Sequence, residues 1–372
     1  MNIKDLILRP HSLPAFSPVS DAMRSPEHAR LVRTYIEELP QLERMLKAMP
    51  YFMESTVETT VTVDSLELPV YSISAGNPDK SAPALLIVGG VHGIERIGSH
   101  VVMSMLHSFI EKSRWDKGLE KLLEKFRIVV VPILNPGGMY LNLRCNPGGV
   151  DLMRNSPIEA TDKIAFLVGG QRFSKRFAWY RGEPERGMEP ENIALENLID
   201  RELKGRPFSL VLDCHSGFGF HDRIWFPYAY RRRPVRKIDT IMAMKLLWES
   251  TYPYHDYIFE PQSNHYLTHG DLWDYFYKKL NKNQAGTFLP FTLEMGSWKW
   301  VKKRPRQLFT IKGLFNPEVP HRQDRVMRRH LVLFDFLMNA AVNYQQWMPT
   351  PSEVPRLRQM ALTHWYDGAV IK

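Results

Sequence analysis

Runs of consecutive apolar residues alternate along the chain with segments in which apolar residues recur every three to four positions. Uninterrupted apolar runs are typical of strands buried on both faces of a sheet, and the longer period is typical of amphipathic helices. Four buried strands are predicted, at residues 84–90, 126–134, 208–217 and 288–297. Helices are predicted between and after them, at residues 92–113, 191–203, 235–251 and 324–347. This alternation indicates an α/β fold with a mixed, mostly parallel sheet flanked by helices.

The pattern before the first buried strand is different. Residues 25–49 show helical periodicity, whereas polar and apolar residues alternate from residue 56 to 76 and predict two strands with a turn at Asp64-Ser65. No linker, repeat or low-complexity segment divides the rest of the chain up to residue 347. We therefore expect three parts: a helical N-terminal extension at 1–54, one α/β domain at 55–348 and a C-terminal tail at 349–372.

Cysteine content and the N-terminus bear on the cellular compartment. The chain has only two cysteines, Cys145 and Cys214, which predicts a reducing environment without a disulfide framework. The N-terminal residues lack the basic start and apolar run of a signal peptide. No apolar run approaches the ~18 residues that a transmembrane helix needs. We expect a cytoplasmic protein without a membrane partner.

The net charge of +9 raises the question of a nucleic-acid partner. The basic residues are spread along the chain, with dense runs only at 231–237 and 302–306. Neither run is interleaved with the aromatic residues on which bases stack. We expect no nucleic-acid partner, and we expect a basic surface that attracts acidic substrates.

Chemically reactive residues follow the predicted strands. His92, His215 and Glu294 each stand at the end of a buried strand, and Glu95 follows His92 by three positions. Ligands of open α/β sheets bind beyond the carboxyl ends of the strands, so we expect these side chains to converge. Two histidines and one carboxylate leave a fourth zinc position open for water, as in catalytic zinc sites. An HxxE pair alone has little weight, because about one is expected by chance among 13 histidines.

The motifs HGIE, NPGG, RCNPGGVDLMRN, DCHSG and FTLEMG follow one another in this order. Their order and spacing resemble those of the zinc carboxypeptidases of the carboxypeptidase A-like superfamily, over about residues 60–345. The RCNPGGVDLMRN block is most similar to that of murein-peptide amidases and cytosolic carboxypeptidases. The resemblance implies an α/β/α fold, one Zn²⁺ per chain, and hydrolysis of a peptide bond at or near a C-terminus in the 55–348 domain.

The resemblance also implies a role for individual residues. Three residues would hold the ion: His92, Glu95 and His215. Glu294 would be the general base, Arg144 would stabilise the oxyanion, and Asp151 would accept the second ring N–H of His92. Three residues would contact the substrate: Arg154, Asn155 and Tyr275. Tyr275 is preferred to Tyr277 because its WDY context is closer to the pattern of the family.

One departure from the family pattern keeps two alternatives open. Met153 stands where an asparagine normally helps the following arginine to hold a terminal carboxylate, and methionine donates no hydrogen bond. One alternative is an N-acyl amino acid deacylase, similar to succinylglutamate desuccinylase and aspartoacylase, which share HxxE, a distant histidine and the glutamate. The other is a non-catalytic zinc-binding relative. The substrate is accordingly expected to be a peptide or an acyl amino acid, held by residues between 220 and 290 that the motifs do not identify.

Overall fold

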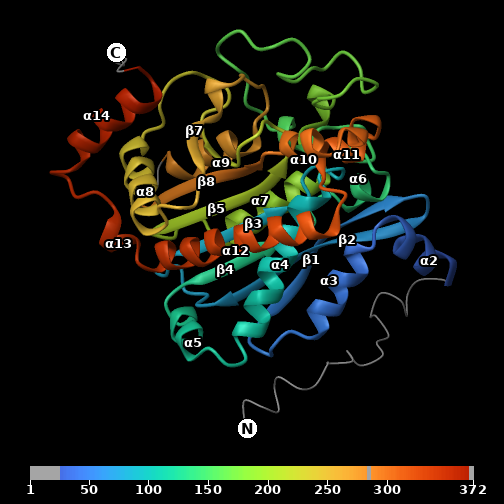
Figure 1. The fold of residues 1–372 in the computed structure, drawn as a ribbon, viewed down its shortest axis with the longest axis horizontal. Coiled ribbons are helices and arrows are strands. Elements are labelled where there is room, and N and C mark those ends of the chain that lie inside the picture. Colours follow the sequence, from blue (N-terminus) through green and yellow to red (C-terminus); the bar gives the residue numbers. More distant parts are fainter. Residues whose placement is uncertain (1–25, 283–285, 368–372) are drawn as a thin grey trace.

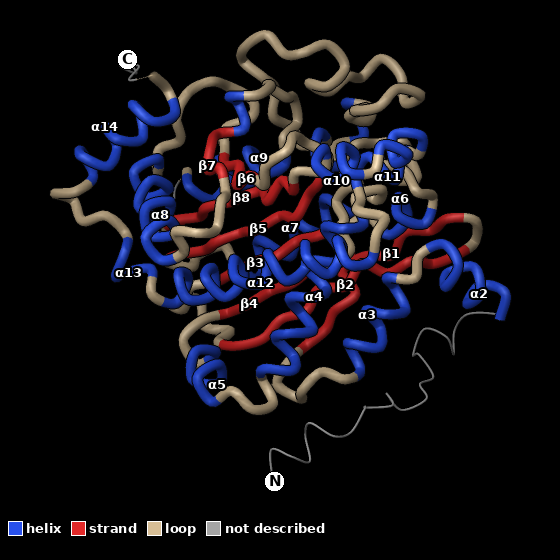
Figure 2. The backbone as a smooth tube through the Cα atoms, in the orientation of Figure 1, coloured by secondary structure: helices blue, strands red, loops and turns tan. Residues whose placement is uncertain are grey.

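The computed structural model describes residues 26–282 and 286–367, and its centre is one sheet of eight strands (Figures 1 and 2). The strands are β1 (Glu54–Val63), β2 (Leu66–Gly76), β3 (Ala84–Gly89), β4 (Arg127–Val131), β5 (Phe208–Ser216), β6 (Arg223–Phe226), β7 (Ile258–Pro261) and β8 (Thr287–Met295). Their order across the sheet is β1-β2-β4-β3-β5-β8-β6-β7. The four central strands run parallel, whereas β2 pairs antiparallel with β1 and β4, and β6 pairs antiparallel with β8. The predicted mixed, mostly parallel sheet is confirmed.

The predicted hairpin and four buried strands are all present. Asp64 and Ser65 have φ of +48° and +66°, the left-handed conformation that a two-residue hairpin turn requires. Strands β6 and β7 were not predicted, because four residues each are too few to show a period. Both lie in the stretch between residues 220 and 290 that the sequence motifs leave unassigned.

Helices cover both faces of the sheet (Figure 1). The α-helices are α2 (Pro26–Tyr35), α3 (Glu38–Lys47), α4 (Arg96–Lys112), α5 (Lys117–Leu123), α6 (Pro136–Tyr140), α7 (Pro190–Glu202), α8 (Ile238–Thr251), α9 (Leu272–Asn281), α10 (Trp298–Lys303), α11 (Ile311–Phe315), α12 (Pro320–Val342), α13 (Tyr344–Trp347) and α14 (Val354–Trp365). Short 3₁₀ helices are η1 (Leu152–Arg154), η2 (Pro184–Arg186), η3 (Gln262–Asn264) and η4 (Pro305–Phe309). On β3, Leu85 and Ile87 pack in the core cluster shared with α4, α8 and α12, and Leu86 and Val88 pack in the cluster shared with α7 and α9. The uninterrupted apolar run of β3 therefore serves two cores.

The N-terminal helices are joined to the sheet domain by a buried ion pair. Glu38 of α3 is fully buried and accepts a 2.6 Å hydrogen bond from Nη1 of Arg96, the first residue of α4. Nε2 of His100 lies 3.0 Å from the other oxygen of Glu38. Nη2 of Arg96 donates to the carbonyl groups of Tyr35 and Met139. Residues 1–25 of the predicted extension lie outside the described residues.

The C-terminal helix α14 packs against α8. Trp365 at its end is buried, and its indole N–H donates to the carbonyl of Phe259 at 2.7 Å. The described part of the predicted tail thus folds back on the sheet beside β7, while residues 368–372 lie outside the description. Among the described helices, none is both long and apolar enough to cross a membrane.

Candidate active site

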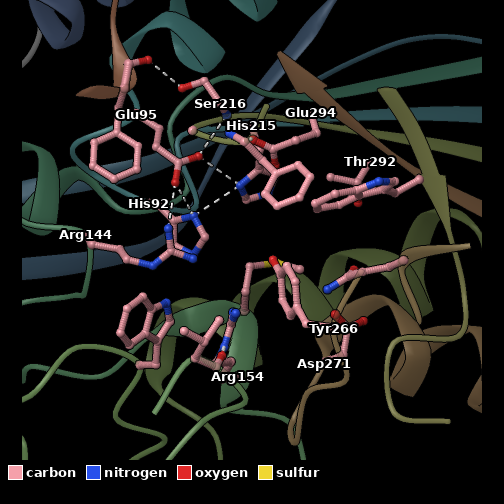
Figure 3. A pocket seen from close by; sticks show the side chains of 18 residues that line it. His92, Glu95, Arg144, Arg154, His215, Ser216, Tyr266, Asp271, Thr292 and Glu294 are labelled. Carbon is pink, nitrogen blue, oxygen red and sulfur yellow. Dashed lines mark hydrogen bonds and ion pairs between the residues drawn. The ribbon is translucent and has the colours of Figure 1, made fainter. Parts of the chain in front are cut away.

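The loops after three neighbouring parallel strands enclose a cavity of about 320 Å³ (Figure 3). His92 and Glu95 lie between β3 and α4, His215 lies near the end of β5, and Glu294 lies near the end of β8. His215 and Glu294 are direct partners in the parallel pairing of β5 and β8, so their side chains leave the sheet on the same face. All four side chains are buried and line the cavity, as the strand ends predicted.

Close backbone contact fixes the path of the loop that carries His92 and Glu95. A Cβ atom on Gly93 would lie 2.1 Å from the carbonyl carbon of Gly138, so only glycine fits there. Gly90 has a φ of +66°, which favours glycine for the turn out of β3. The loop is therefore held tightly against the segment that follows β4.

The two histidines direct their Nδ1 atoms toward each other and their Nε2 atoms toward carboxylates. Nε2 of His92 lies 3.1 Å from Asp151, and Nε2 of His215 lies 2.6 Å from Asp213. A carboxylate on Nε2 stabilises the tautomer in which Nδ1 keeps its lone pair. The two Nδ1 atoms lie 3.1 Å apart, and those of His92 and His215 lie 2.9 and 3.2 Å from the carboxylate oxygens of Glu95. Three ligand groups thus converge on one point.

Charged neighbours adjust these ligands for metal binding. Burial would raise the pKa of the Glu95 carboxyl, but its neighbours His92 and His215 hold that pKa well below its usual value. Arg144 adds to this effect, because its Nη1 donates to Glu95 at 2.8 Å and its Nε donates to Asp151 at 3.0 Å. Burial favours neutral His215, but the charge of Asp213 raises the pKa of this histidine well above its usual value. A carboxylate partner of this kind makes an imidazole a stronger metal ligand.

Glu294 lies in the same cavity but outside the ligand group. Its Oε1 accepts a hydrogen bond from the backbone N–H of Phe218 at 3.1 Å. Burial, reinforced by the negative charge of Glu95, raises the pKa of Glu294 to about 8. A carboxyl group with a pKa near neutrality is suited to accept and return a proton.

The opposite wall of the cavity carries groups of both charges. Arg154, Met153, Tyr266 and Asp271 all line it. Nε of Arg154 donates to the carbonyl of Val168 at 2.9 Å, which fixes the guanidinium. Asp271 caps α9, and burial raises its pKa to about 6. The wall therefore offers a fixed cation and, above about pH 6, an anion.

The donor set of His92, Glu95 and His215 fits Zn²⁺. Their ligand atoms all lie within 4.8 Å of one another, and two imidazoles with one carboxylate leave a coordination position open. The protein-family model described as "Zinc carboxypeptidase" matches residues 41–308. The chain belongs to the zinc carboxypeptidase family. Its potential metal site therefore agrees with the family that its sequence matches.

Curated members of the zinc carboxypeptidase family match parts of the chain. Carboxypeptidase D of Anas platyrhynchos is 23% identical over 195 residues, 51% of this chain and 12% of that protein. Carboxypeptidase E of Caenorhabditis elegans is 26% identical over 163 residues, 40% of this chain and 33% of that protein. The inactive metallocarboxypeptidase ECM14 of Ajellomyces capsulatus is 24% identical over 178 residues, 42% of this chain and 27% of that protein. The matches span a third or less of each relative, and membership alone does not establish catalysis.

Solved structures show the same fold. Thrombin activatable fibrinolysis inhibitor superposes with a TM-score of 0.62 at 20% identity, over 92% of this chain and 81% of that one. Carboxypeptidase A from Helicoverpa armigera gives a TM-score of 0.60 at 15% identity, over 85% of this chain and 80% of that one. At these identities the likeness concerns the fold alone.

The structure corrects two of the predicted substrate contacts. Tyr275 lies on α9 outside the cavity, and its hydroxyl donates to Glu196 at 2.6 Å, whereas Tyr266 on the preceding loop lines the cavity. Asn155 also lies outside, because its Nδ2 donates to the carbonyl of Arg181 at 2.9 Å and its Oδ1 accepts from the backbone of Glu189 at 2.6 Å. Asn155 therefore braces neighbouring loops, although Arg154 beside it does line the cavity.

Asp213, the carboxylate that orients His215, was not among the predicted site residues. Its position two residues before His215 was a usable signal, because side chains at i and i+2 of a strand share a face. Asp213 also accepts a 2.7 Å hydrogen bond from the indole N–H of Trp273, which fixes the carboxylate. Cys214 between them packs in the core instead, and both cysteines are free.

Proposed function

We propose that this protein is a zinc-dependent metallocarboxypeptidase that hydrolyses the amide bond at or near the C-terminus of a peptide. The observation that carries the proposal is the position of Glu294. This carboxylate shares one buried cavity with His92, Glu95 and His215 but is not one of the converging ligands. A metal site with an adjacent, unligated carboxylate is suited to hydrolysis.

One Zn²⁺ per chain, bound by His92, Glu95 and His215, would polarise the scissile carbonyl and lower the pKa of a bound water toward about 7. Glu294 takes a proton from the attacking water on its carboxylate and passes it to the nitrogen of the leaving amine. The raised pKa of Glu294 makes its carboxylate a stronger base toward the attacking water, and the positive charge of the metal site favours the ionised starting form.

Arg144 supplies the fixed positive charge for the transition state. Its bonds to Glu95 and Asp151 hold the guanidinium at the cavity wall before substrate arrives. A preorganised cation of this kind stabilises the negative charge that develops on the carbonyl oxygen.

Arg154 recognises the carboxylate of the substrate. It is buried, fixed by the carbonyl of Val168 and directed into the cavity wall beside Tyr266. Met153 lines the same wall, and its thioether offers no hydrogen-bond donor to a substrate carboxylate. We therefore assign the carboxylate contact to Arg154 with help from the hydroxyl of Tyr266.

The test compares wild type with Glu294→Gln and with the control Glu196→Gln, whose side chain contacts Tyr275 outside the cavity. Bound zinc and hydrolysis of a peptide library are measured on each purified protein. We expect about one zinc in all three, and hydrolysis lowered by about 10² to 10⁴-fold in Glu294→Gln alone, the usual effect of losing a positioned base. Zinc binding without any peptide hydrolysis by wild type would overturn the proposal, and N-acyl amino acids would then be tried as substrates.

A further inference from the structure

A segment far along the chain contacts the loop that carries Glu95. After β8, helix α11 ends at Phe315, and the next residue, Asn316, is buried with 5% of its surface exposed. Its Oδ1 accepts a 2.9 Å hydrogen bond from the N–H of Ile97, and its Nδ2 donates to the carbonyl of Ile94 at 2.8 Å. These two backbone groups flank Glu95, so one side chain holds the ligand loop on both sides of the ligand.

The residue before Asn316, Phe315, also contacts the end of β5, the strand that carries His215. The carbonyl of Phe315 accepts a 2.8 Å hydrogen bond from the hydroxyl of Ser216. The backbone N–H of Ser216 donates in turn to Glu95 at 3.0 Å, so this residue lies between the two ligands (Figure 3). A Cβ atom on Gly217 would lie 2.8 Å from the ring of Phe315, which shows how closely the two segments pack.

Only an amide of this size satisfies all the groups around Asn316. Its Nδ2 also donates to the carbonyl of Lys312 at 2.9 Å, so both of its N–H bonds and its oxygen are used. Aspartate would leave the buried carbonyl of Ile94 without a donor and would add a charge. The contact with Lys312 is local to α11, whereas the other two bonds of the side chain join α11 to the backbone on each side of Glu95.

We propose that Asn316 is a positioning residue of the metal centre. Together with the carbonyl of Phe315 it fixes the loop of Glu95 and the end of β5, with His215, relative to each other, so that the ligands are already arranged when Zn²⁺ arrives. The proposal rests on the metal-binding role of these ligands given above, and it adds a contact from outside residues 41–308, which match the family.

The test measures zinc affinity by competition with a chelator, together with the unfolding temperature of the metal-free protein. The variant is Asn316→Asp, and the matched control is Asn343→Asp. Asn343 is exposed and follows α12. Its Nδ2 donates to the carbonyl four residues earlier, just as Nδ2 of Asn316 donates to the carbonyl of Lys312. We expect zinc binding about 10- to 100-fold weaker in Asn316→Asp, the usual effect of losing an outer contact of a metal site, and unchanged in Asn343→Asp.

A second variant keeps the proposal testable if Asn316→Asp does not fold. Ser216→Ala removes the bond to Phe315 from the other side, and we expect about fivefold weaker zinc binding, the equivalent of one hydrogen bond. Variants that are less stable without metal but bind zinc as tightly as wild type would overturn the positioning role and leave the proposed function intact. A wild type that binds no zinc would overturn both.

Discussion

Replacing Glu38 with glutamine is expected to destabilise the metal-free protein by about 3 kcal/mol at pH 7. Burial would raise the pKa of Glu38, but the hydrogen bond with His100 and the charge of Arg96 lower it from 4.5 to about 2. A folded-state pKa below the unfolded one means that the ionised group stabilises the fold above about pH 4.5, and that this gain is lost as the pH falls toward about 2. A pKa difference of about 2.5 corresponds to about 3 kcal/mol, which agrees with the cost of breaking a buried ion pair.

Urea-induced unfolding followed by tryptophan fluorescence, with a chelator present, measures this difference. The stability gap between wild type and Glu38→Gln should be about 3 kcal/mol at pH 7 and less than half of that at about pH 3. The control is Glu37→Gln, whose exposed side chain precedes the ion pair, and it should change stability by less than about 0.5 kcal/mol. A gap that is absent at pH 7, or that is equal at both pH values, would refute the linkage between Glu38 and Arg96.

Three further outcomes concern the cavity. Glu294→Gln should release about one proton fewer than wild type when Zn²⁺ binds at pH 7, because the pKa of about 8 leaves Glu294 mostly protonated until the cation arrives. A pH indicator in weak buffer measures the release, and equal release by the two proteins would contradict this. Asp213→Asn should weaken zinc binding by about 10- to 100-fold in a chelator competition, because His215 loses its anionic partner. Unchanged affinity would show that Asp213 does not strengthen His215 as a ligand. Tyr266→Phe should lower kcat/KM for peptide hydrolysis by about tenfold, the equivalent of one hydrogen bond to a charged group, and Tyr275→Phe should leave it unchanged. The reverse result would restore Tyr275 as the substrate contact.

The ligands could be predicted from the sequence because their positions are local features of strands. A buried strand of six or more apolar residues is recognisable, and a histidine or glutamate at its end stands out against the run. Parallel strands bring their carboxyl ends to one edge of the sheet, so His92, His215 and Glu294 needed no tertiary information to be grouped. The same reasoning would have found Asp213, because residues 213 and 215 of one strand share a face.

The substrate contacts depend on loops, and there the prediction partly failed. Tyr275 was chosen because its WDY context resembles the family pattern, but that context does not record that α9 turns this side chain toward Glu196. Tyr266 lies on the loop before α9, where no periodicity marks it. Arg154 is the last residue of η1 and Asn155 follows it, and both were assigned to the substrate. Their side chains project in different directions, because Arg154 lines the cavity and Asn155 contacts the backbone of Glu189.

The contacts that hold the metal loop come from both sides of the family match. Glu38 binds Arg96, the residue after Glu95, and Asn316 binds the backbone on each side of Glu95, yet both lie outside residues 41–308. The ligands themselves lie inside that range, at the ends of strands that the family shares. Because an ion-binding loop is preorganised by what surrounds it, we expect its affinity to depend on these outer contacts as well as on the ligands. Replacing Glu38 or the amide of Asn316 should therefore weaken zinc binding in a chelator competition even though His92, Glu95 and His215 are all kept.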